Sequence, residues 1–114
     1  MINLILKSKK DQHHAIAIMD SNGITIKAGS RINKTLKFPA MSMYIQQLRC
    51  NEKYVDQNGE LLTDITFMNP TQAALFVTGR SVNGYIAWRV NDKISLKTYR
   101  ELSETERSKF ECLD

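Results

Sequence analysis

Hydrophobic and polar residues alternate in the first quarter of the chain with the period of two that is typical of β-strands. The alternation runs over residues 2–6, 14–19 and 24–28. The second and third runs are joined by Asp20-Ser21-Asn22-Gly23, and an Asn-Gly step between alternating runs is the strongest short-range signal for a hairpin. The sequence therefore predicts that the chain opens as an antiparallel meander.

From residue 40 to about residue 53 the apolar positions instead recur every three or four residues, which is the period of a helix with one buried stripe. The predicted stripe comprises Met41, Tyr44, Ile45 and Leu48. The polar residues off the stripe are expected to be exposed: Gln46, Gln47, Arg49 and Lys53.

A second helix has a signal at each end. Asn69 suits the N-cap, Pro70 suits the first helical position because no backbone N–H is needed there, and Gly79 suits the left-handed residue after the last turn. A strand over residues 61–67, which follows an Asn58-Gly59 turn, leads into this helix.

Beyond the helix, Asn83-Gly84 predicts a tight turn and residues 85–90 a strand. Alternation would place Tyr85, Ala87 and Arg89 on one face and Ile86, Trp88 and Val90 on the buried one. We therefore assign Trp88 to the core.

The rest of the chain is predicted to form a hairpin and a helix. Asn91-Asp92 turns the chain, and Ile94 with Leu96 completes the hairpin. Ser103 and Glu106 have the spacing of a capping box, which predicts a helix over residues 104–112. The predicted fold class is α+β: residues 1–114 form a single domain, an antiparallel sheet with two to three helices packed on one side.

Composition narrows the functional classes. Hydrophobic residues make up 42% and charged residues 25% of the 114 positions, which argues against a disordered chain. No apolar run approaches the roughly 20 residues that span a membrane, and the N-terminus lacks the features of a secretion signal. We expect a cytoplasmic protein without membrane partners.

Motifs for catalysis or metal binding were not found. The chain has no phosphate-binding glycine loop, nucleophile turn or zinc-protease motif, and we predict that it is not an enzyme. Cys50 and Cys112 lie far apart in the sequence, and on a strand His13 and His14 would face opposite ways. No metal site or cofactor is therefore predicted.

Charge is distributed unevenly along a chain whose net charge is +4. Residues 7–37 contain seven lysines and arginines against two aspartates. A basic stretch of this kind can form a phosphate-binding face, and it can equally be a solvated surface that keeps the protein soluble.

Two glycine-containing loops strengthen the first alternative. Gly29-Ser30-Arg31 and Gly79-Arg80-Ser81 each place a cation and a hydroxyl beside flexible backbone, an arrangement suited to phosphate, and the two loops could share one face. Tyr85 could stack on a base, and Asn83 could read a base edge or serve only in the turn. The candidate nucleic-acid-binding residues are Lys27, Ser30, Arg31, Lys34, Arg80, Ser81, Asn83, Tyr85 and Arg89.

Three stretches together carry a family resemblance: residues 23–31, residues 69–74 with the sequence Asn-Pro-Thr-Gln-Ala-Ala, and residues 79–88, from Gly-Arg-Ser to Trp. They resemble an uncharacterised bacterial domain found at the C-terminal end of GIY-YIG endonuclease-like and restriction-modification proteins. That domain is similar to the RAMA (restriction enzyme and adenine methylase associated) domain, which is expected to recognise DNA. The resemblance spans roughly residues 13–100.

Nuclease activity is not implied by the resemblance. Gly23-Ile24-Thr25 is not the Gly-Ile-Tyr strand of the nuclease, and no Tyr-Ile-Gly strand, catalytic arginine or metal-binding glutamate follows it. Tyr85 also stands where the relatives usually have tryptophan.

The resulting hypothesis is a non-catalytic nucleic-acid-binding module, with DNA favoured over RNA, in restriction, defence or mobile-element biology. The alternative is a small phage or mobile-element regulator that inhibits a nuclease or another defence-system protein, or binds its nucleic-acid complex. The dependence of binding on salt concentration distinguishes the two hypotheses, because direct binding to nucleic acid weakens steeply as salt is raised.

Overall fold

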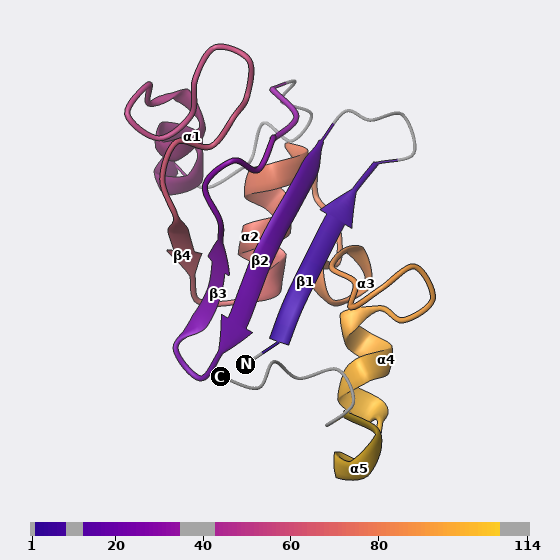
Figure 1. Cartoon of the computed structure of the whole chain (residues 1–114). Helices are drawn as coiled ribbons and strands as arrows, with labels where there is room; N and C mark the ends of the chain where they lie inside the picture. The colour runs from indigo at the N-terminus through magenta and orange to yellow at the C-terminus, as the bar shows by residue number, and fades with distance from the viewer. Residues whose placement is uncertain (1, 9–12, 35–42, 108–114) are drawn as a thin grey trace.

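Four antiparallel strands form the sheet of the computed structural model, which describes residues 2–8, 13–34 and 43–107. The strands are β1 (Ile2–Lys7), β2 (His14–Asp20), β3 (Gly23–Ile26) and β4 (Ile65–Phe67), paired in that order (Figure 1). The β2–β3 hairpin has Asp20 opposite Gly23. The predicted meander is confirmed.

The strand predicted over residues 61–67 is shorter in the structure, where only its last three residues belong to β4. Leu61 instead forms an isolated bridge with Val55 across the turn that contains Asn58 and Gly59. Its backbone also pairs with the loop after β3, because Leu61 N donates to Ser30 O over 2.7 Å.

One face of the sheet is buried and the other is open. The buried face comprises Ile2, Leu4, Leu6, Ala15, Ala17, Ile24, Ile26, Ile65 and Phe67, each at most 8% exposed. The central residues of the opposite face, which we call the open sheet face, are Asn3, Ile5, Ile16, Ile18, Thr25 and Thr66. Ile16, at its centre, is 48% exposed.

The helix α2 (Pro70–Thr78) has the ends that the sequence predicts. Asn69 Oδ1 accepts a backbone hydrogen bond of 2.9 Å in the first turn, and Gly79 ends the helix with a φ of 74°. The ring of Phe76 packs on that of Phe67, with 5.4 Å between their centroids. This contact fixes α2 on the buried face of the sheet.

The prediction of a strand over residues 85–90 is wrong. Asn83 does not make a hairpin turn but caps the short helix α3 (Gly84–Ala87), its Oδ1 accepting from Tyr85 N over 3.0 Å. Because a helix turns by about 100° per residue, Ile86 does not share the environment of Trp88 and is 52% exposed.

Trp88 is fully buried, as predicted for the core. Its Nε1 donates to Pro70 O over 3.1 Å and so ties the end of α3 to the beginning of α2. The two helices approach closely at Gly84, where a Cβ atom would lie 2.3 Å from the carbonyl carbon and oxygen of Pro70. Glycine at position 84 is therefore required by packing.

After α3 the chain adds a single antiparallel bridge to the outer edge of β1. Arg89 and Ile5 exchange two backbone hydrogen bonds, of 2.8 and 2.9 Å. Asn91 then turns the chain, accepting from two backbone N–H groups, and Val90 N donates to Ile94 O as the predicted hairpin requires.

Leu96, predicted to extend the hairpin, instead begins the helix α4 (Leu96–Glu101). Ser95 caps it by accepting from Thr98 N over 3.2 Å, a signal that the sequence analysis missed. The predicted Ser103–Glu106 capping box is present and begins α5 (Glu104–Arg107). Residues 108–112 of the predicted helix lie outside the described part of the chain.

The helix α1 (Met43–Cys50) confirms the helix predicted over residues 40–53 but not all of its buried stripe. Ile45 is buried, whereas Tyr44 is 60% exposed, and Met41 lies outside the described residues. Arg49, predicted to be exposed, is only 5% exposed. It follows Ile45 by four residues and therefore lies on the same side of the helix.

The guanidinium group of Arg49 joins three segments. Nη1 donates to Phe76 O in the last turn of α2, and Nη2 donates to Asn33 O in the segment after β3. The partner at Phe76 is a helix carbonyl near the C-terminal end, where cations are favoured. Arg49 thus anchors α1 and the residue 31–34 segment to α2.

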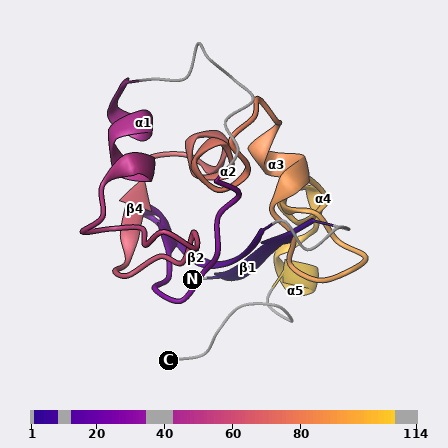
Figure 2. The same cartoon turned by 90° about the horizontal axis from the view of Figure 1, so that it is seen from above.

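The helices form a layer on the buried side of the sheet. Viewed from above, α2 lies at the centre with α1 and α3 on either side (Figure 2). This agrees with the predicted α+β class. No helix in the described ranges is long and apolar enough to cross a membrane.

Candidate nucleic-acid interface

The two glycine-containing loops lie at the same end of the sheet, where β2 begins. The first loop returns to β2 through Arg31, whose backbone N–H and C=O pair with those of His14 over 2.8 and 2.9 Å. The second loop follows Gly79 at the C-terminal end of α2. Asn33 N donates to Val77 O over 2.8 Å, which connects the two loops.

His13 lies directly before β2, next to the backbone pair that His14 forms with Arg31. Its side chain is only 3% exposed, and its Nδ1 atom is buried without a hydrogen-bond partner among the residues that the structure describes. Burial lowers the pKa of His13 below its ordinary value of 6.5, and the positive charges of Arg80 and Arg31 lower this pKa further. The two arginines therefore act on one imidazole from separate loops.

This environment predicts a pH dependence of stability. Because the pKa of His13 is lower in the folded than in the unfolded chain, the unfolded chain binds more protons once the pH falls to about 6.5. We expect the free energy of unfolding to fall as the pH is lowered from 7.5 through 6.5. Urea unfolding of wild type and His13→Asn at several pH values measures this effect, which should be smaller in the variant.

His14→Asn is the matched control, because His14 is the exposed neighbour of His13. It should retain the pH dependence of the wild type. Equal pH dependence in wild type and His13→Asn would contradict the assignment to His13.

The other predicted residues at this end are Arg80, Ser81 and Ser30, and they differ in exposure. Arg80 and Ser81 are both exposed, and within the described residues neither side chain forms a hydrogen bond or an ion pair. Ser30, in contrast, is 5% exposed and its Oγ accepts from Ile16 N over 3.0 Å. Ser30 thus supports the loop and is not available to a phosphate.

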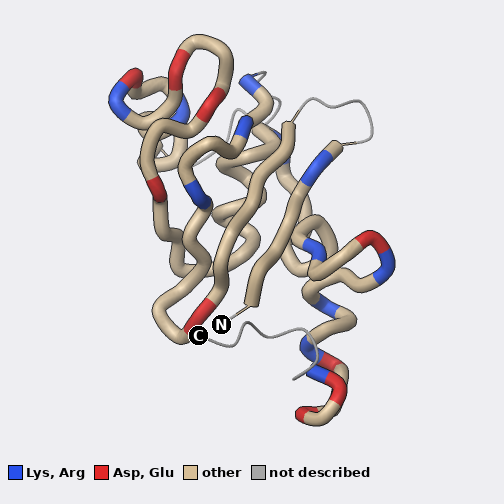
Figure 3. Tube along the Cα trace, in the orientation of Figure 1, with Lys and Arg blue, Asp and Glu red and all other residues tan. Residues whose placement is uncertain are grey.

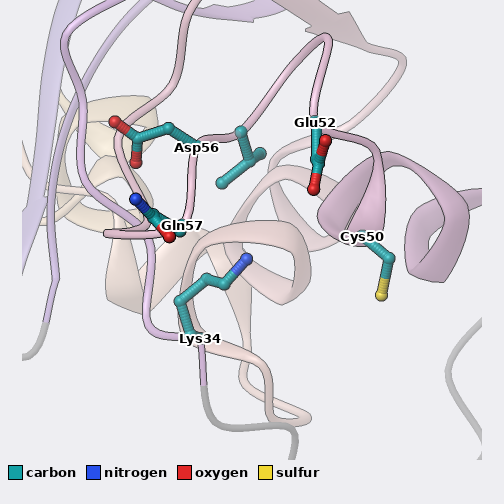
Figure 4. A pocket seen from close by; sticks show the side chains of 6 residues that line it. Lys34, Cys50, Glu52, Asp56 and Gln57 are labelled. Carbon is teal, nitrogen blue, oxygen red and sulfur yellow. The ribbon is translucent and has the colours of Figure 1, made fainter.

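Lys34 lies at a cavity of about 550 Å³ that is separate from the imidazole of His13. Figure 4 shows its side chain extending between Asp56 and Gln57 on one side and Glu52 and Cys50 on the other. Two carboxylates line the same cavity, so its charge disfavours a phosphate. Lys34 therefore does not belong to the same candidate site as Arg31 and Arg80.

Lys27 forms an ion pair with Asp64, the residue directly before β4. Its Nζ lies 2.7 Å from Asp64 Oδ2, and Ala28 N donates to the other oxygen over 2.8 Å. These hydrogen bonds hold the pKa of Asp64 below its usual range. Lys27 is thus paired with a carboxylate, and both side chains of the pair are exposed.

The remaining predicted residues lie near α3 and have structural partners. Asn83 is the cap of α3, and Arg89 donates to the backbone oxygens of Asn91 and Asp92, over 3.3 and 3.0 Å. Tyr85 is half-buried beside the beginning of α2, and the guanidinium of Arg100 lies 4.6 Å from the centre of its ring. Arg31, Arg80 and Ser81 belong to the two loops at the end of the sheet where β2 begins, and they form the core of the candidate interface.

Two further features of the sequence indicate residues at this end of the sheet. Extending the alternation of β2 by one residue places His13 on the buried side with Ala15. Lys7, which is exposed and pairs with His14 across β1 and β2, adds a cation at the same end. Figure 3 shows basic positions at this end of the sheet, but also on α1 and α4, so the charge is not confined to one surface.

Metal coordination has no support in residues 2–8, 13–34 and 43–107, which contain no group of three histidine, cysteine or acidic side chains able to hold an ion.

Comparison with known proteins places the chain in a family. No curated protein and no solved structure matches it. A family model with the description "Domain of unknown function (DUF4357)" matches residues 4–100, which extend from β1 into α4. The match covers most of the chain, and the protein therefore belongs to the DUF4357 family.

Proposed function

We propose that this domain binds nucleic acid without catalysing a reaction, and that Arg31 and Arg80 contact the phosphate backbone. The observation that carries the proposal is that two loops far apart in the sequence lie at one end of the sheet: Arg31 pairs with His14 there, and Asn33 N donates to Val77 O in the last turn of α2, the helix that precedes Arg80. Guanidinium groups also suit phosphate, because their donors match its oxygens in pairs.

Neighbouring residues support the same assignment. Ser81 is exposed next to Arg80, and Lys7 is exposed at the end of β1. Both residue types make phosphate contacts in protein–nucleic acid complexes, where such contacts set position rather than sequence preference. The resemblance to the module of GIY-YIG endonuclease-like and restriction-modification proteins, and to the RAMA domain, favours DNA and a cytoplasmic role in restriction or defence.

The test is a fluorescence-anisotropy titration of short single- and double-stranded DNA and RNA at low and near-physiological salt. We expect salt-sensitive binding, weakened about tenfold by Arg31→Ala or Arg80→Ala, since a hydrogen bond to a charged group contributes about 1.5–3 kcal/mol. Loss of both contacts should reduce the slope of log affinity against log salt by about 2.

Lys97→Ala is the matched control, because Lys97 is an exposed cation on α4, away from the two loops. It should leave affinity within about twofold of the wild type, given that no contact is removed. Absence of binding to every nucleic acid at low salt would overturn the proposal.

The open sheet face favours a second candidate, a regulator that binds a nuclease or its nucleic-acid complex. Ile5 and Ile16 are cross-strand neighbours there, and Ile16 is 48% exposed. An exposed apolar sheet surface is a common protein contact. This candidate predicts that Ile16→Lys abolishes a complex with a nuclease and leaves nucleic-acid affinity unchanged, whereas Arg80→Ala does the reverse.

A further inference from the structure

A cavity of about 320 Å³ lies at the end of the sheet where β2 turns into β3, away from the end that carries the two glycine-containing loops. Its lining comes from the β2–β3 hairpin, from Met68 after β4, from Tyr85 of α3 and from Arg100 of α4. Met19, Ile24 and Met68 give it apolar surface, and Met68 is 88% exposed. The volume is at the lower end of the range for small-molecule sites, about 300–1,000 Å³, and methionine surfaces suit aromatic ligands.

One side of the cavity combines an aromatic ring with a guanidinium group. Cζ of Arg100 lies 4.6 Å from the centre of the Tyr85 ring, which is within the range of a cation–π contact. Arg100 is exposed, and its guanidinium forms no hydrogen bond or ion pair with any residue that the structure describes. The side of the guanidinium away from Tyr85 is therefore accessible to a second planar group, and nucleobases stack on arginine in this way.

The hairpin side of the cavity carries a hydrogen-bond acceptor. Asp20 lines the cavity, and its Oδ1 accepts from Asn22 N over 2.8 Å in the turn. Oδ2 of Asp20 has no hydrogen-bond partner in the described part of the chain, so it is available to a ligand. In nucleic-acid recognition, carboxylates accept from the exocyclic amino group of a base such as cytosine.

The charges of the cavity balance. Among the described residues that line it, Asp20 and Arg100 are the charged ones, and their charges are opposite. A phosphate or a charged peptide side chain would therefore gain little there, because it is attracted by one group and repelled by the other. A neutral ring with a hydrogen-bond donor on its edge fits both groups.

We propose that this cavity binds one unpaired nucleobase, which stacks on Arg100 and donates an amino-group hydrogen bond to Asp20. The inference rests on the proposed function, which supplies the strand. Arg31 pairs with His14 at the beginning of β2 and Asp20 ends it, so the length of β2, roughly 20 Å, separates the two sites. About six nucleotides of a single strand cover this distance at the stacked spacing of about 3.4 Å per base.

Base preference is the first readout. Anisotropy titrations compare two single-stranded oligonucleotides of about ten nucleotides, one of cytosine and one of thymine, which has no amino group. We expect cytosine to be favoured by about tenfold, as for one hydrogen bond to a charged group. Asp20→Asn should reduce the ratio of the two affinities to near one, while its side-chain oxygen still accepts from Asn22 N and keeps the turn.

Stacking is tested by Arg100→Lys, which keeps the positive charge and removes the planar group. Affinity for the cytosine strand should fall at least about fivefold, the lower limit for loss of one stacked base, with an unchanged dependence on salt. Lys97→Ala is the matched control, because Lys97 is an exposed cation of the same helix that does not line the cavity. It should leave the base preference unchanged. Thermal unfolding shows whether each variant is folded.

The outcomes separate this inference from the proposed function. Salt-sensitive binding that depends on Arg31 and Arg80, but is unaffected by Asp20→Asn and Arg100→Lys, would overturn the base site and leave nucleic-acid binding intact. Absence of binding to every oligonucleotide would overturn both. Cytidine competing as effectively as the oligonucleotide would assign the cavity to a free nucleoside, and N-acetyltyrosine amide competing better than cytidine would assign it to a protein side chain. Either result would overturn the inference.

Discussion

Replacing Trp88 with alanine is expected to lower the free energy of unfolding by about 3–5 kcal/mol. Trp88 is fully buried, and its indole fills the space between α3 and the beginning of α2. Truncation removes the largest side chain of the core and leaves the Pro70 carbonyl without its 3.1 Å hydrogen bond. Urea unfolding followed by far-UV circular dichroism measures the change, because Trp88 is the single tryptophan and its fluorescence is lost in the variant.

Ile86→Ala is the matched control, since Ile86 is an apolar residue of the same helix that is 52% exposed. Its loss should cost less than about 1 kcal/mol, as for most surface positions. Similar costs for the two substitutions would show that Trp88 is not a core residue, and the packing of α3 on α2 would have to be revised.

Replacing Arg49 with methionine is expected to cost about 3 kcal/mol, because two carbonyl groups lose their donors and each buried unpaired group costs about 1–3 kcal/mol. The affected carbonyls are those of Phe76 and Asn33. Burial also lowers the pKa of Arg49, so part of the cost is offset when the buried charge is removed. The measurement is urea unfolding at pH 7.

Gln47→Met serves as the control on the exposed side of the same helix, where stability should change by no more than about 0.5 kcal/mol. Hydrogen exchange should separately show faster exchange of Asn33 N–H in Arg49→Met, because the residue 31–34 segment has lost its anchor to α2. An unchanged free energy of unfolding in Arg49→Met would mean that water replaces the guanidinium group at both carbonyls.

The elements that the sequence predicts well are those with local signals at both ends. The meander has alternating runs and a short turn, and α2 has its cap, its first-turn proline and its terminal glycine within ten positions. Each of these signals acts between residues that are close in the chain. Local physics is therefore enough to place them.

The failure at Asn83-Gly84 has a physical cause. An Asn-Gly pair suits a hairpin turn, but asparagine is equally suited to cap a helix. The choice is made by tertiary contacts, since Gly84 must lie against the backbone of Pro70 and Trp88 must reach the Pro70 carbonyl. Neither contact can be inferred from the sequence around residue 83.

In the candidate site, too, some features follow from local sequence and others depend on tertiary contacts. That the two glycine-containing loops share one end of the molecule agrees with the sequence hypothesis, although binding by Arg31 and Arg80 stays a prediction. The side chains of Ser30, Asn83 and Arg89 form hydrogen bonds with backbone groups of the fold, and a part for them in binding stays a prediction. The sequence did not indicate His13 as a residue of this site, because the fold brings the loops of Arg31 and Arg80 near it and their spacing in the sequence does not.

The pairing of β4 with β3 has a consequence for the rate at which the protein folds. Thr25 and Thr66 are neighbours across this pair, with their hydroxyl oxygens 2.7 Å apart, although they are 41 positions apart in the chain. Closing such a long loop costs roughly 2 kcal/mol more chain entropy than closing the short β1–β2 connection. The hairpins can therefore form and dissolve many times before β4 docks, and distant contacts such as this one lengthen the folding time.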